Sequence, residues 1–415
     1  MSRIDELIKR FCPYGVEYVA LGELGVFENI GVDKKTIEGE QKVMLLNFMD
    51  VMRNKNIHKE ILTMQVSASD SKIEKCDIKQ YDIFITPTSE TRDEIGFAAV
   101  ADEDIFDAVY SYHLMRYRLF HKNSITPYFI RYLFEVDNLR NQIFKASKGL
   151  TRFGLSTKDF AKLRIPYPSL EVQEEIVKTL DLFIELEAEL EAELEARKTQ
   201  YTHYRDSLLS FEGKEVEWKT LGEIGEFIRG NGLQKKDFTE SGVGCIHYGQ
   251  IYTHYGSSAT KTKTFVSPDL AKKLKKARKN DLIIAGVSEN VEDVCKAVVW
   301  LGDEDICISG DAFIFRHMQN PKYIGYLLQT KSFLEFKKKY AQGAKVTRLQ
   351  SGRLPQFVVP IPSLNEQERV ASILEKFDAL VNDISIGLPA EIKGRRKQYE
   401  YYRNKLLTFK EFSNE

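Results

Sequence analysis

Residues 168–211 read PSLEVQEEIVKTLDLFIELEAELEAELEARKTQYTHYRDSLLSF. After the first three residues this stretch contains no glycine and no proline, and Leu186, Leu190 and Leu194 recur at every fourth position. Side chains at that spacing lie on one face of an α-helix. The stretch therefore predicts one continuous helix of roughly 40 residues, or about 60 Å at 1.5 Å per residue.

An isolated helix of this length with an unpaired apolar stripe is not stable, so it needs a partner helix. Residues 365–411 supply one. We expect the pair to lie antiparallel, as duplicated halves do when a two-fold axis relates them. The second copy contains Gly387-Leu388-Pro389, which predicts a break or kink. Residues 362–368 (PSLNEQE) repeat residues 168–174, and residues 398–409 (QYEYYRNKLLTF) repeat residues 200–211.

The segments outside the two helices are duplicated as well. Residues 16–27 (VEYVALGELGVF) match residues 216–227 (VEWKTLGEIGEF). Short apolar runs broken by turn residues follow each copy and predict strands, and one longer helical pattern follows them. Many short strands with an attached helix indicate an α+β recognition domain. Strands are expected at residues 82–85, 97–100, 281–284 and 297–300, and helices at residues 127–145 and 321–340.

The expected fold is α+β, with two mixed α/β domains joined by two long antiparallel helices. Residues 8–11 also align with residues 208–211, so the opening DELIKRF resembles the end of the first long helix. This alignment favours a pseudo-two-fold cyclic repeat over the alternative that the opening segment is an ordinary surface helix. The blocks are residues 1–165 (first mixed domain with an N-terminal helical segment), 166–213 (first helix), 214–360 (second mixed domain) and 361–415 (second helix, kinked near 387–389).

The composition of the 415-residue chain sets limits on its class. It is 43% hydrophobic and 29% charged with a formal net charge of −1, which is typical of a soluble globular protein and does not by itself predict a nucleic-acid binder. Its five cysteines form no CxxC pair, which favours free thiols in a reducing compartment over zinc. With no secretory leader and no long apolar run, we expect a cytoplasmic protein that does not cross a membrane.

Catalytic motifs are absent from the sequence. Gly230-Asn231-Gly232 lacks the third glycine of a dinucleotide fingerprint, and there is no GxxxxGK[ST] loop, HExxH pair, GxSxG elbow or Asn-Pro-Pro-aromatic tetrapeptide. Residues 335–337 and 391–393 have the ExK form seen in some nucleases, but both lie in helical patterns and are typical of solvated faces. The sequence therefore predicts a non-catalytic chain with no cofactor or metal of its own.

A basic run in the second mixed domain is the first positive signal. Residues 272–279 (KKLKKARK) follow Lys261 and Lys263 closely. Such runs are as often plain solvated surface, but their functional role is phosphate contact. Residues 247–255 (HYGQIYTHY) combine aromatic rings with hydrogen-bonding groups, and Gln250 could pair bidentately with adenine. The first domain has residues 47–55 (NFMDVMRNK) at the matching place, so the frame repeats while the polar groups differ.

Two further pairs of matching segments are candidates for base reading. Residues 89–92 (SETR) match residues 288–290 (SEN), and residues 148–152 (KGLTR) match residues 343–348 (GAKVTR). For any single residue a structural role is at least as common as a base contact. The candidate DNA contacts are Arg53, Lys55, Thr91, Arg92, Lys148, Thr151, Arg152, Tyr248, Gln250, Tyr252, His254, Lys261, Lys263, Lys272, Lys275, Lys276, Asn290, Lys345 and Arg348.

With these features the chain resembles the specificity subunits of Type I restriction-modification systems. The resemblance spans essentially the whole chain and is carried by the domain order, the two P-S-L-x-x-Q-E helix entries, the similar helix ends, and the strand entries LGELG (21–25) and LGEIG (221–225). The chain departs from a straight, symmetric helix pair at Gly387-Leu388-Pro389.

The resemblance implies two target-recognition domains that each read one half of a bipartite, asymmetric site in double-stranded DNA, with the helices as a spacer. It also implies two methyltransferase subunits that carry S-adenosylmethionine, and restriction/translocase subunits that use ATP and Mg. The helices would dock these partners, through candidate contacts Gln173, Glu174, Tyr201, Tyr204, Arg205, Gln367, Glu368, Tyr399, Tyr402 and Arg403. The rival classes are a helical adaptor or dimerisation protein without DNA contact, and a nuclease.

Overall fold

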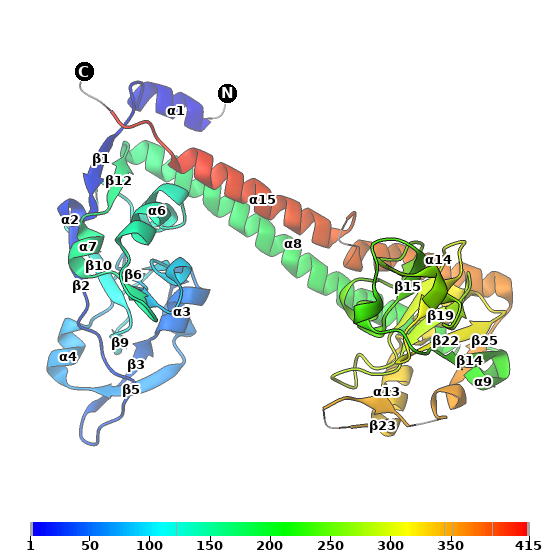
Figure 1. Ribbon diagram of the computed structural model, residues 1–415. Helices are drawn as coiled ribbons and strands as arrows, with labels where there is room; N and C mark the ends of the chain where they lie inside the picture. Colours follow the sequence, from blue (N-terminus) through cyan, green and yellow to red (C-terminus); the bar gives the residue numbers. More distant parts are fainter. Residues whose placement is uncertain (1–2, 122, 344, 351, 384, 413–415) are drawn as a thin grey trace. The chain divides into compact units, whose positions relative to one another are not determined.

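The computed structural model consists of two compact units. Unit 1 comprises Met1–Ala188 and Gly394–Glu415, and unit 2 comprises Glu189–Lys393. Figure 1 shows the helices and strands of each unit. The residues that the structure describes are 3–121, 123–343, 345–350, 352–383 and 385–412.

Unit 1 is built on a five-stranded sheet in the order β2-β10-β6-β8-β4. Neighbouring strands are antiparallel except β4 and β8, which run parallel. The central strand β6 is buried along its whole length, as its run of Ile and Phe predicts. The strands are β2 (Gly25–Glu28), β10 (Met115–Leu119), β6 (Ile83–Ile85), β8 (Ala98–Ala101) and β4 (Asn56–Ile57).

Unit 1 also contains a three-stranded sheet in the order β5-β3-β9 and two small pairs, β1-β12 and β7-β11. In each unit, we call the sheets with the short helices that pack on them the recognition part. These strands are β5 (Met64–Ala68), β3 (Gln41–Leu46), β9 (Ala108–Tyr110), β1 (Glu17–Ala20), β12 (Arg164–Tyr167), β7 (Thr88–Ser89) and β11 (Phe153–Gly154). The helices are α1 (Arg3–Phe11), α2 (Leu21–Leu24), α3 (Phe48–Arg53), α4 (Asp70–Lys75), α5 (Pro127–Leu133), α6 (Asp137–Ala146) and α7 (Thr157–Ala161).

Unit 2 repeats this plan. Its five-stranded sheet has the order β14-β22-β19-β20-β16, and its second sheet has the order β17-β15-β21-β18. The strands are β14 (Gly225–Arg229), β22 (Ala312–His317), β19 (Leu282–Ala285), β20 (Ala297–Trp300), β16 (Ser258–Ala259), β17 (Thr264–Val266), β15 (Val243–Ile246), β21 (Ile306–Ile308), β18 (Lys276–Ala277), β13 (Glu217–Thr220), β25 (Val358–Ile361), β23 (Ala341–Gln342) and β24 (Arg348–Leu349). Its short helices are α9 (Leu221–Ile224), α10 (Tyr248–Thr253), α11 (Pro268–Ala271), α12 (Pro321–Leu327) and α13 (Lys331–Tyr340).

The helical patterns at residues 127–145 and 321–340 each form two helices, where the sequence predicts one. In unit 2 the Thr330 side chain accepts a hydrogen bond from the backbone N–H of Phe333 at 3.4 Å and so begins α13 as a separate helix. In unit 1 a turn of three residues separates α5 from α6. The turn lets both short helices bury an apolar face, which one straight helix could not do.

The first long helix is continuous, as the sequence predicts. It is α8 (Leu170–Ser210), of 41 residues. Its burial is concentrated near its ends: Val172, Ile176 and Leu180 join the core of unit 1, and Tyr201 and Leu209 join the core of unit 2. The leucine stripe expected in the middle is only partly covered, since Leu186 is 37% exposed.

The second helical region consists of two helices, α14 (Leu364–Asn382) and α15 (Leu388–Leu407). In unit 1 α8 and α15 are antiparallel: the rings of Phe183 and Tyr402 stack with centroids 5.6 Å apart, while Glu187 farther along α8 pairs with Arg396 farther back on α15. In unit 2 α14 packs on α8, where the rings of Tyr204 and Phe377 stack. No helix among the described residues is long and apolar enough to cross a membrane.

The cyclic repeat is confirmed within each unit. In unit 1, Ile4 of α1 joins the same core cluster as Val172 of α8, and the backbone N–H of Val16 donates to the carbonyl of Lys410 at 2.9 Å. The N-terminal segment therefore lies beside the C-terminal end of the chain. In unit 2 the last turns of α8 take the place that α1 has in unit 1, since Leu209 shares a core cluster with Val370 at the start of α14.

Candidate nucleic-acid interface

Parallel pairing of β15 and β21 brings two loops of unit 2 to one edge. Cys245 pairs with Cys307 and Ile246 with Ile308, so both strands end side by side. The backbone N–H of Tyr248 then donates to the Ser309 hydroxyl at 2.9 Å. Residues that follow parallel strands commonly form binding sites, because their loops meet there and are held by the sheet.

The loop after β14 and the basic run reach the same edge. The Asn231 side-chain amide donates to the carbonyl of Lys273 at 2.9 Å and accepts from the backbone N–H of Lys275 at 2.8 Å. The side chains of Lys273, Lys275 and Lys276 are exposed, and no ion pair engages them within the part of the chain that the structure describes. They are therefore free to contact an anionic partner.

Asp311 lies between two exposed arginines at this edge. Its Oδ1 is 4.0 Å from Arg229 Nη2 and 3.8 Å from Arg348 Nη2. Arg348 lies next to Thr347, whose backbone pairs with Ser288 through hydrogen bonds of 2.7 and 3.0 Å. We call the set that meets here the loop edge of unit 2; it consists of Arg229, Asn231, Tyr248, Lys273, Lys275, Asp311 and Arg348.

Unit 1 forms an equivalent edge where β3 and β9 run parallel. Residues 111–113 follow β9, and the backbone N–H of Tyr112 donates to the carbonyl of Val32 at 3.1 Å. Burial, and then the positive charges of Arg152 and Lys34, lower the pKa of His113. Arg152 donates from its Nη2 to the Thr88 hydroxyl at 3.4 Å, beside the β7-β11 pair. By correspondence with unit 2 in the internal repeat, we call Asn29, Lys34, Tyr112, His113, Thr151 and Arg152 the loop edge of unit 1.

The two loop edges share a backbone plan but differ in side chains. His113 of unit 1 stands two residues after Ser111, the residue that follows β9, as Asp311 of unit 2 stands two residues after Ser309, the residue that follows β21. Asn29 likewise matches Arg229 at the end of the first strand of the five-stranded sheet. One feature is common to both edges, a Thr-Arg dipeptide, which occurs at residues 151–152 and 347–348.

The structure places several predicted DNA contacts on or beside these edges. They include Arg348, Arg152, Thr151, Lys275 and Tyr248, and Tyr248 is the first residue of α10. The β7-β11 pair brings residues 89–92 beside residues 148–152, and the bridge between Ser288 and Thr347 does the same in unit 2. The remaining exposed candidates are Arg53, Thr91, Lys148, Lys261, Lys263, Lys272, Lys276 and Lys345.

Other candidates are engaged inside unit 2. The Gln250 side chain accepts from the backbone N–H of His247 at 2.9 Å and donates to the Thr264 hydroxyl at 3.1 Å, so it caps α10. The Asn290 amide bonds Asp293, and the Tyr252 hydroxyl donates to the carbonyl of Val287 at 2.8 Å. These groups support the loops and leave little capacity for a base.

Lys55 belongs to an ionic cluster of unit 1 instead of a loop edge. Its Nζ lies 3.3 Å from Glu135, whose carboxylate also accepts from Arg403 at 3.1 Å and from the Tyr399 hydroxyl at 3.0 Å. We call Lys55, Arg131, Glu135, Tyr399 and Arg403 the ionic cluster; it joins the recognition part of unit 1 to α15. Arg92 is similarly engaged, with its guanidinium 4.9 Å from the ring centroid of Phe144 and 4.7 Å from that of Phe153.

Four of the predicted partner contacts are buried, which corrects their assignment. Gln173 and Gln367 are 0% exposed, and Tyr201 and Tyr399 are 4% and 9% exposed. Each lies on a long helix and faces the recognition part of its own unit, so none can reach a partner subunit. The sequence could not distinguish these positions, because a polar residue on a helix is more often exposed than buried.

The other six predicted partner contacts are at least partly accessible. Glu174, Tyr204 and Glu368 are exposed. Arg205 pairs with Asp206, Tyr402 stacks on Phe183, and Arg403 belongs to the ionic cluster, so these three are half-buried and take part in contacts within their units.

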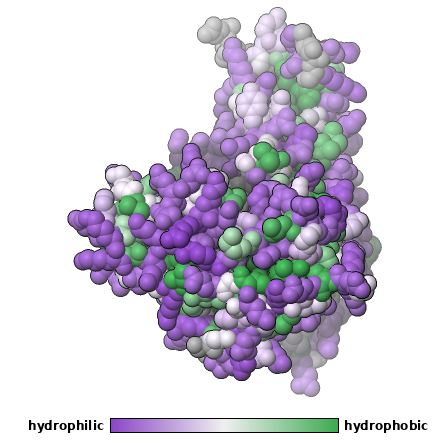
Figure 2. Space-filling model, turned by 90° about the vertical axis from the view of Figure 1, so that its right-hand side faces the viewer, coloured by the Kyte–Doolittle hydropathy of each residue, from purple (hydrophilic) through white to green (hydrophobic). Residues whose placement is uncertain are grey.

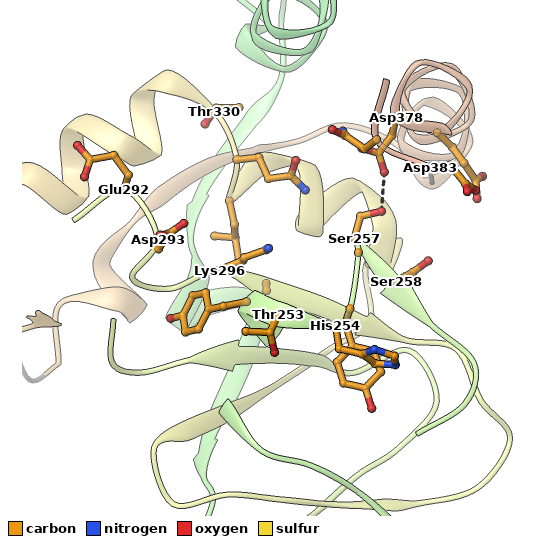
Figure 3. A pocket seen from close by; sticks show the side chains of 18 of the residues that line it. Thr253, His254, Ser257, Ser258, Glu292, Asp293, Lys296, Thr330, Asp378 and Asp383 are labelled. Atoms are coloured by element: carbon orange, nitrogen blue, oxygen red, sulfur yellow. Dashed lines mark hydrogen bonds between the residues drawn. The ribbon is translucent and has the colours of Figure 1, made fainter. Parts of the chain in front are cut away.

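A cleft of about 890 Å³ opens in unit 2 between the end of α10, the turn at residues 292–297, α13 and α14. Figure 3 shows the hydrogen bond, 2.7 Å long, from the Ser257 hydroxyl to Asp378 at its wall. His254, a predicted DNA contact, lines this cleft and not the loop edge. Among the residues that the structure describes, no group of three or more His, Cys, Asp or Glu could hold a metal ion.

Sequence reasoning missed Arg229, Asn231 and Asp311. Their contribution depends on strand pairing between segments far apart in the chain, which no local pattern reveals. The local signal available was a charged residue, Arg229, at the end of β14. The face of unit 2 that Figure 2 presents is mainly hydrophilic, with hydrophobic side chains gathered in a limited band.

Comparison with known proteins matches this duplicated plan. The sequence model of a family described as "Type I restriction modification DNA specificity domain" matches residues 13–196 and again residues 213–394. A Type I restriction enzyme EcoR124I/EcoR124II specificity subunit of Escherichia coli is 36% identical over 255 residues, covering 60% of this chain and 63% of that protein. The match thus spans less than two thirds of that relative's length. A putative Type I restriction enzyme specificity subunit of Haemophilus influenzae is 30% identical over 285 residues, covering 63% and 68%.

Solved structures share the fold along nearly the whole chain. One solved chain has a TM-score of 0.63 at 17% identity, covering 96% of this chain and 98% of that one. Its structure is described as "Structural basis underlying complex assembly and conformational transition of the type I R-M system". The HsdS subunit from Thermoanaerobacter tengcongensis has a TM-score of 0.52 at 17% identity, covering 96% and 97%.

Proposed function

The chain belongs to the Type I restriction modification DNA specificity domain family, and we propose that it is the DNA-reading subunit of such a system. Each loop edge reads one half of a bipartite, asymmetric site in double-stranded DNA. The observation that carries this proposal is one backbone plan that presents two different sets of edge side chains. Two domains that share a fold but differ in their edge side chains can recognise a site whose two halves differ in sequence.

The chemistry of the edges supports DNA as the partner. Exposed lysines such as Lys273 and Lys275 supply phosphate contacts, which give affinity without sequence information. Arginine, asparagine and tyrosine at the same edge supply the hydrogen bonds that distinguish bases in the major groove. Both kinds of contact are available at the loop edge of unit 2.

The helices serve as spacer and docking surface in this proposal. Residues 166–213 and 361–415 separate the recognition domains, residues 1–165 and 214–360. Exposed helical residues, among them Glu174, Tyr204 and Glu368, contact two methyltransferase subunits. Those partners carry S-adenosylmethionine, and restriction/translocase subunits add ATP and Mg, so the chemistry takes place outside this chain.

A domain exchange tests the proposal. Residues 216–355 are replaced by the equivalent domain of a relative, and methylated motifs are mapped in cells that express the chain with its methyltransferase partners. We expect one half of the methylated site to change and the other half to remain. A motif that stays whole, or changes in both halves, would contradict the assignment of one half-site to each unit.

The adaptor alternative predicts a different result. A helical adaptor without DNA contact would leave the migration of labelled duplex unchanged when it joins its partners, at any salt concentration. The proposed reader shifts the duplex in a salt-dependent way. The purified chain alone should neither methylate nor cleave DNA, and metal-dependent cleavage by the chain alone would favour the nuclease alternative.

A further inference from the structure

Arg229 presents a guanidinium group whose orientation is already set. Its Nε donates to the carbonyl of Gly310 at 3.1 Å, and its Nη2 lies 4.0 Å from the Asp311 carboxylate. The side chain is nevertheless 69% exposed. No other hydrogen bond or ion pair engages this guanidinium within the described ranges, so its Nη1 end is available to a ligand.

We infer that Arg229 determines specificity in unit 2 by pairing bidentately with a guanine of the half-site that this unit reads. This inference rests on the proposed function and names one of its base contacts. A guanidinium fork held along one edge loses less freedom on binding than a free one. A bidentate hydrogen-bonded pair between arginine and the O6 and N7 atoms of guanine is the commonest specific contact in the major groove.

The internal repeat distinguishes Arg229 from its neighbour Arg348. Arg348 has a counterpart in unit 1, Arg152, in the same Thr-Arg dipeptide after a glycine turn. If the same side chain occurs in two domains that read different sequences, it is best explained by a contact that both half-sites offer. That contact is the phosphate backbone, which carries no sequence information. Arg229 has Asn29 at its matching place, so it is among the residues that can distinguish the halves.

Asp311 acts on this contact as a positioning residue. Its carboxylate lies within 4.0 Å of Arg229 and 3.8 Å of Arg348, and so holds two like charges at one edge without bonding tightly to either. Asp311→Asn should lower the preference for the guanine and leave the other half-site unchanged. A purely structural role would lower the midpoint of thermal unfolding and leave the base preference as it is.

The experiment compares Arg229→Asn, Arg229→Lys and Arg348→Ala in the full chain with its methyltransferase subunits. The probes are duplexes that carry the wild-type motif or one altered base pair in it. Both Arg229 variants should lose discrimination at one position of one half-site by on the order of 5- to 150-fold. Arg348→Ala should leave the motif unchanged and weaken binding to all duplexes, with a shallower salt dependence.

The outcomes separate this inference from the proposed function. If the wild-type complex methylates no bipartite site, the proposed function itself fails. If the wild-type site is found but both Arg229 variants keep every base preference, the inference is wrong and Arg229 binds phosphate or solvent. Arg229→Lys keeps the positive charge and removes only the two-pronged geometry of the guanidinium group. It therefore tests the inference even if Arg229→Asn fails to fold.

Discussion

The Gln173 side chain accepts a hydrogen bond from the backbone N–H of Thr126 at 2.9 Å, although the two residues lie 47 positions apart. Its amide also donates to the carbonyls of Pro168 and Ser124. Gln173 therefore joins the first turn of α8 to the N-terminus of α5, and it does so with its side chain fully buried.

Gln367 makes the same connection in unit 2. It accepts from the backbone N–H of Asn320 at 2.9 Å and donates to the carbonyl of Pro362 at 2.9 Å. The repeated P-S-L-x-x-Q-E segment thus has a structural explanation. Each copy begins a long helix and attaches it to the recognition part of its own unit, where a buried polar group must be hydrogen-bonded.

Replacing Gln173 by Met should destabilise unit 1 with little change in volume. The substitution leaves the backbone N–H of Thr126 without its partner in a buried site, which costs about 1–3 kcal/mol. Urea unfolding and hydrogen exchange of α5 and α8 amides measure the effect. Gln367→Met should do the same in unit 2, whereas the exposed Glu174→Ala should change stability by less than about 0.5 kcal/mol. Equal stability of Gln173→Met and Glu174→Ala would refute the role of the buried bond.

Local patterns account for most of what the sequence predicts correctly. The continuous α8 follows from an uninterrupted helical period, and the two-unit plan follows from the duplication itself. The strands at β6 and β19 follow from short apolar runs. The division of each helical pattern into α5 and α6, or α12 and α13, could not be read in advance, because the packing of both short helices on a sheet decides it.

The candidate site was less accessible to sequence reasoning. The basic run and the aromatic segment predict contact with DNA, but strand pairing decides which segments lie together at one edge. Gln250 has the side chain of an adenine reader and is instead a helix cap. Lys55 looks like a surface cation and lies in the ionic cluster. Arg229 belonged to none of the candidate segments, and it lies at the loop edge because β14 ends there.

The ionic cluster should make unit 1 sensitive to acid. Burial alone would raise the pKa of Glu135, but the positive charges of Lys55, Arg131 and Arg403 lower it below its ordinary value. A lowered pKa in the folded state adds stability above the ordinary glutamate pKa of about 4.3, and this stability is lost as pH falls through the lowered value. Glu135→Gln should cost about 3 kcal/mol at neutral pH, because it leaves partly buried cations unpaired.

The measurement is the free energy of unfolding of wild type and Glu135→Gln across a pH series. The difference between them should be largest at neutral pH and should shrink as the solution is made acidic. Glu185→Gln replaces an exposed carboxylate of α8 in the same unit and serves as the control. A difference that stays constant with pH would mean that Glu135 has the same pKa in the folded and unfolded states, which would contradict the lowered pKa.

Two leucines of α8 should respond differently to truncation. Leu180 is 0% exposed and lies in the core of unit 1, so Leu180→Ala should lower stability by about 2–5 kcal/mol. Leu186 is 37% exposed, so Leu186→Ala should change the stability of the isolated chain by less than about 0.5 kcal/mol. Thermal unfolding measures both, and similar losses would show that the middle of α8 is covered in solution.

Lys275 and Lys276 should contribute affinity without sequence preference. Replacing both with alanine removes two exposed cations from the start of β18 and should weaken binding to every duplex. The slope of log affinity against log salt should fall by about two, since each phosphate contact contributes roughly one unit. Titration of labelled duplexes at several salt concentrations checks this, and a change in the methylated motif would show that the lysines also read bases.

Substitution of Gln250 can distinguish a structural role of this side chain from a role in reading a base. In Gln250→Glu a side-chain oxygen remains to accept from the backbone N–H of His247, and the Thr264 hydroxyl can donate to the new carboxylate, so the cap of α10 is kept. A carboxylate cannot donate to the N7 atom of adenine, so the same change would abolish a bidentate adenine pair. We expect Gln250→Glu to methylate the wild-type motif and Gln250→Ala to lower the stability of unit 2 by about 1–2 kcal/mol. If Gln250→Glu instead changes one base of the motif while folding normally, Gln250 must leave its cap on DNA and read that base.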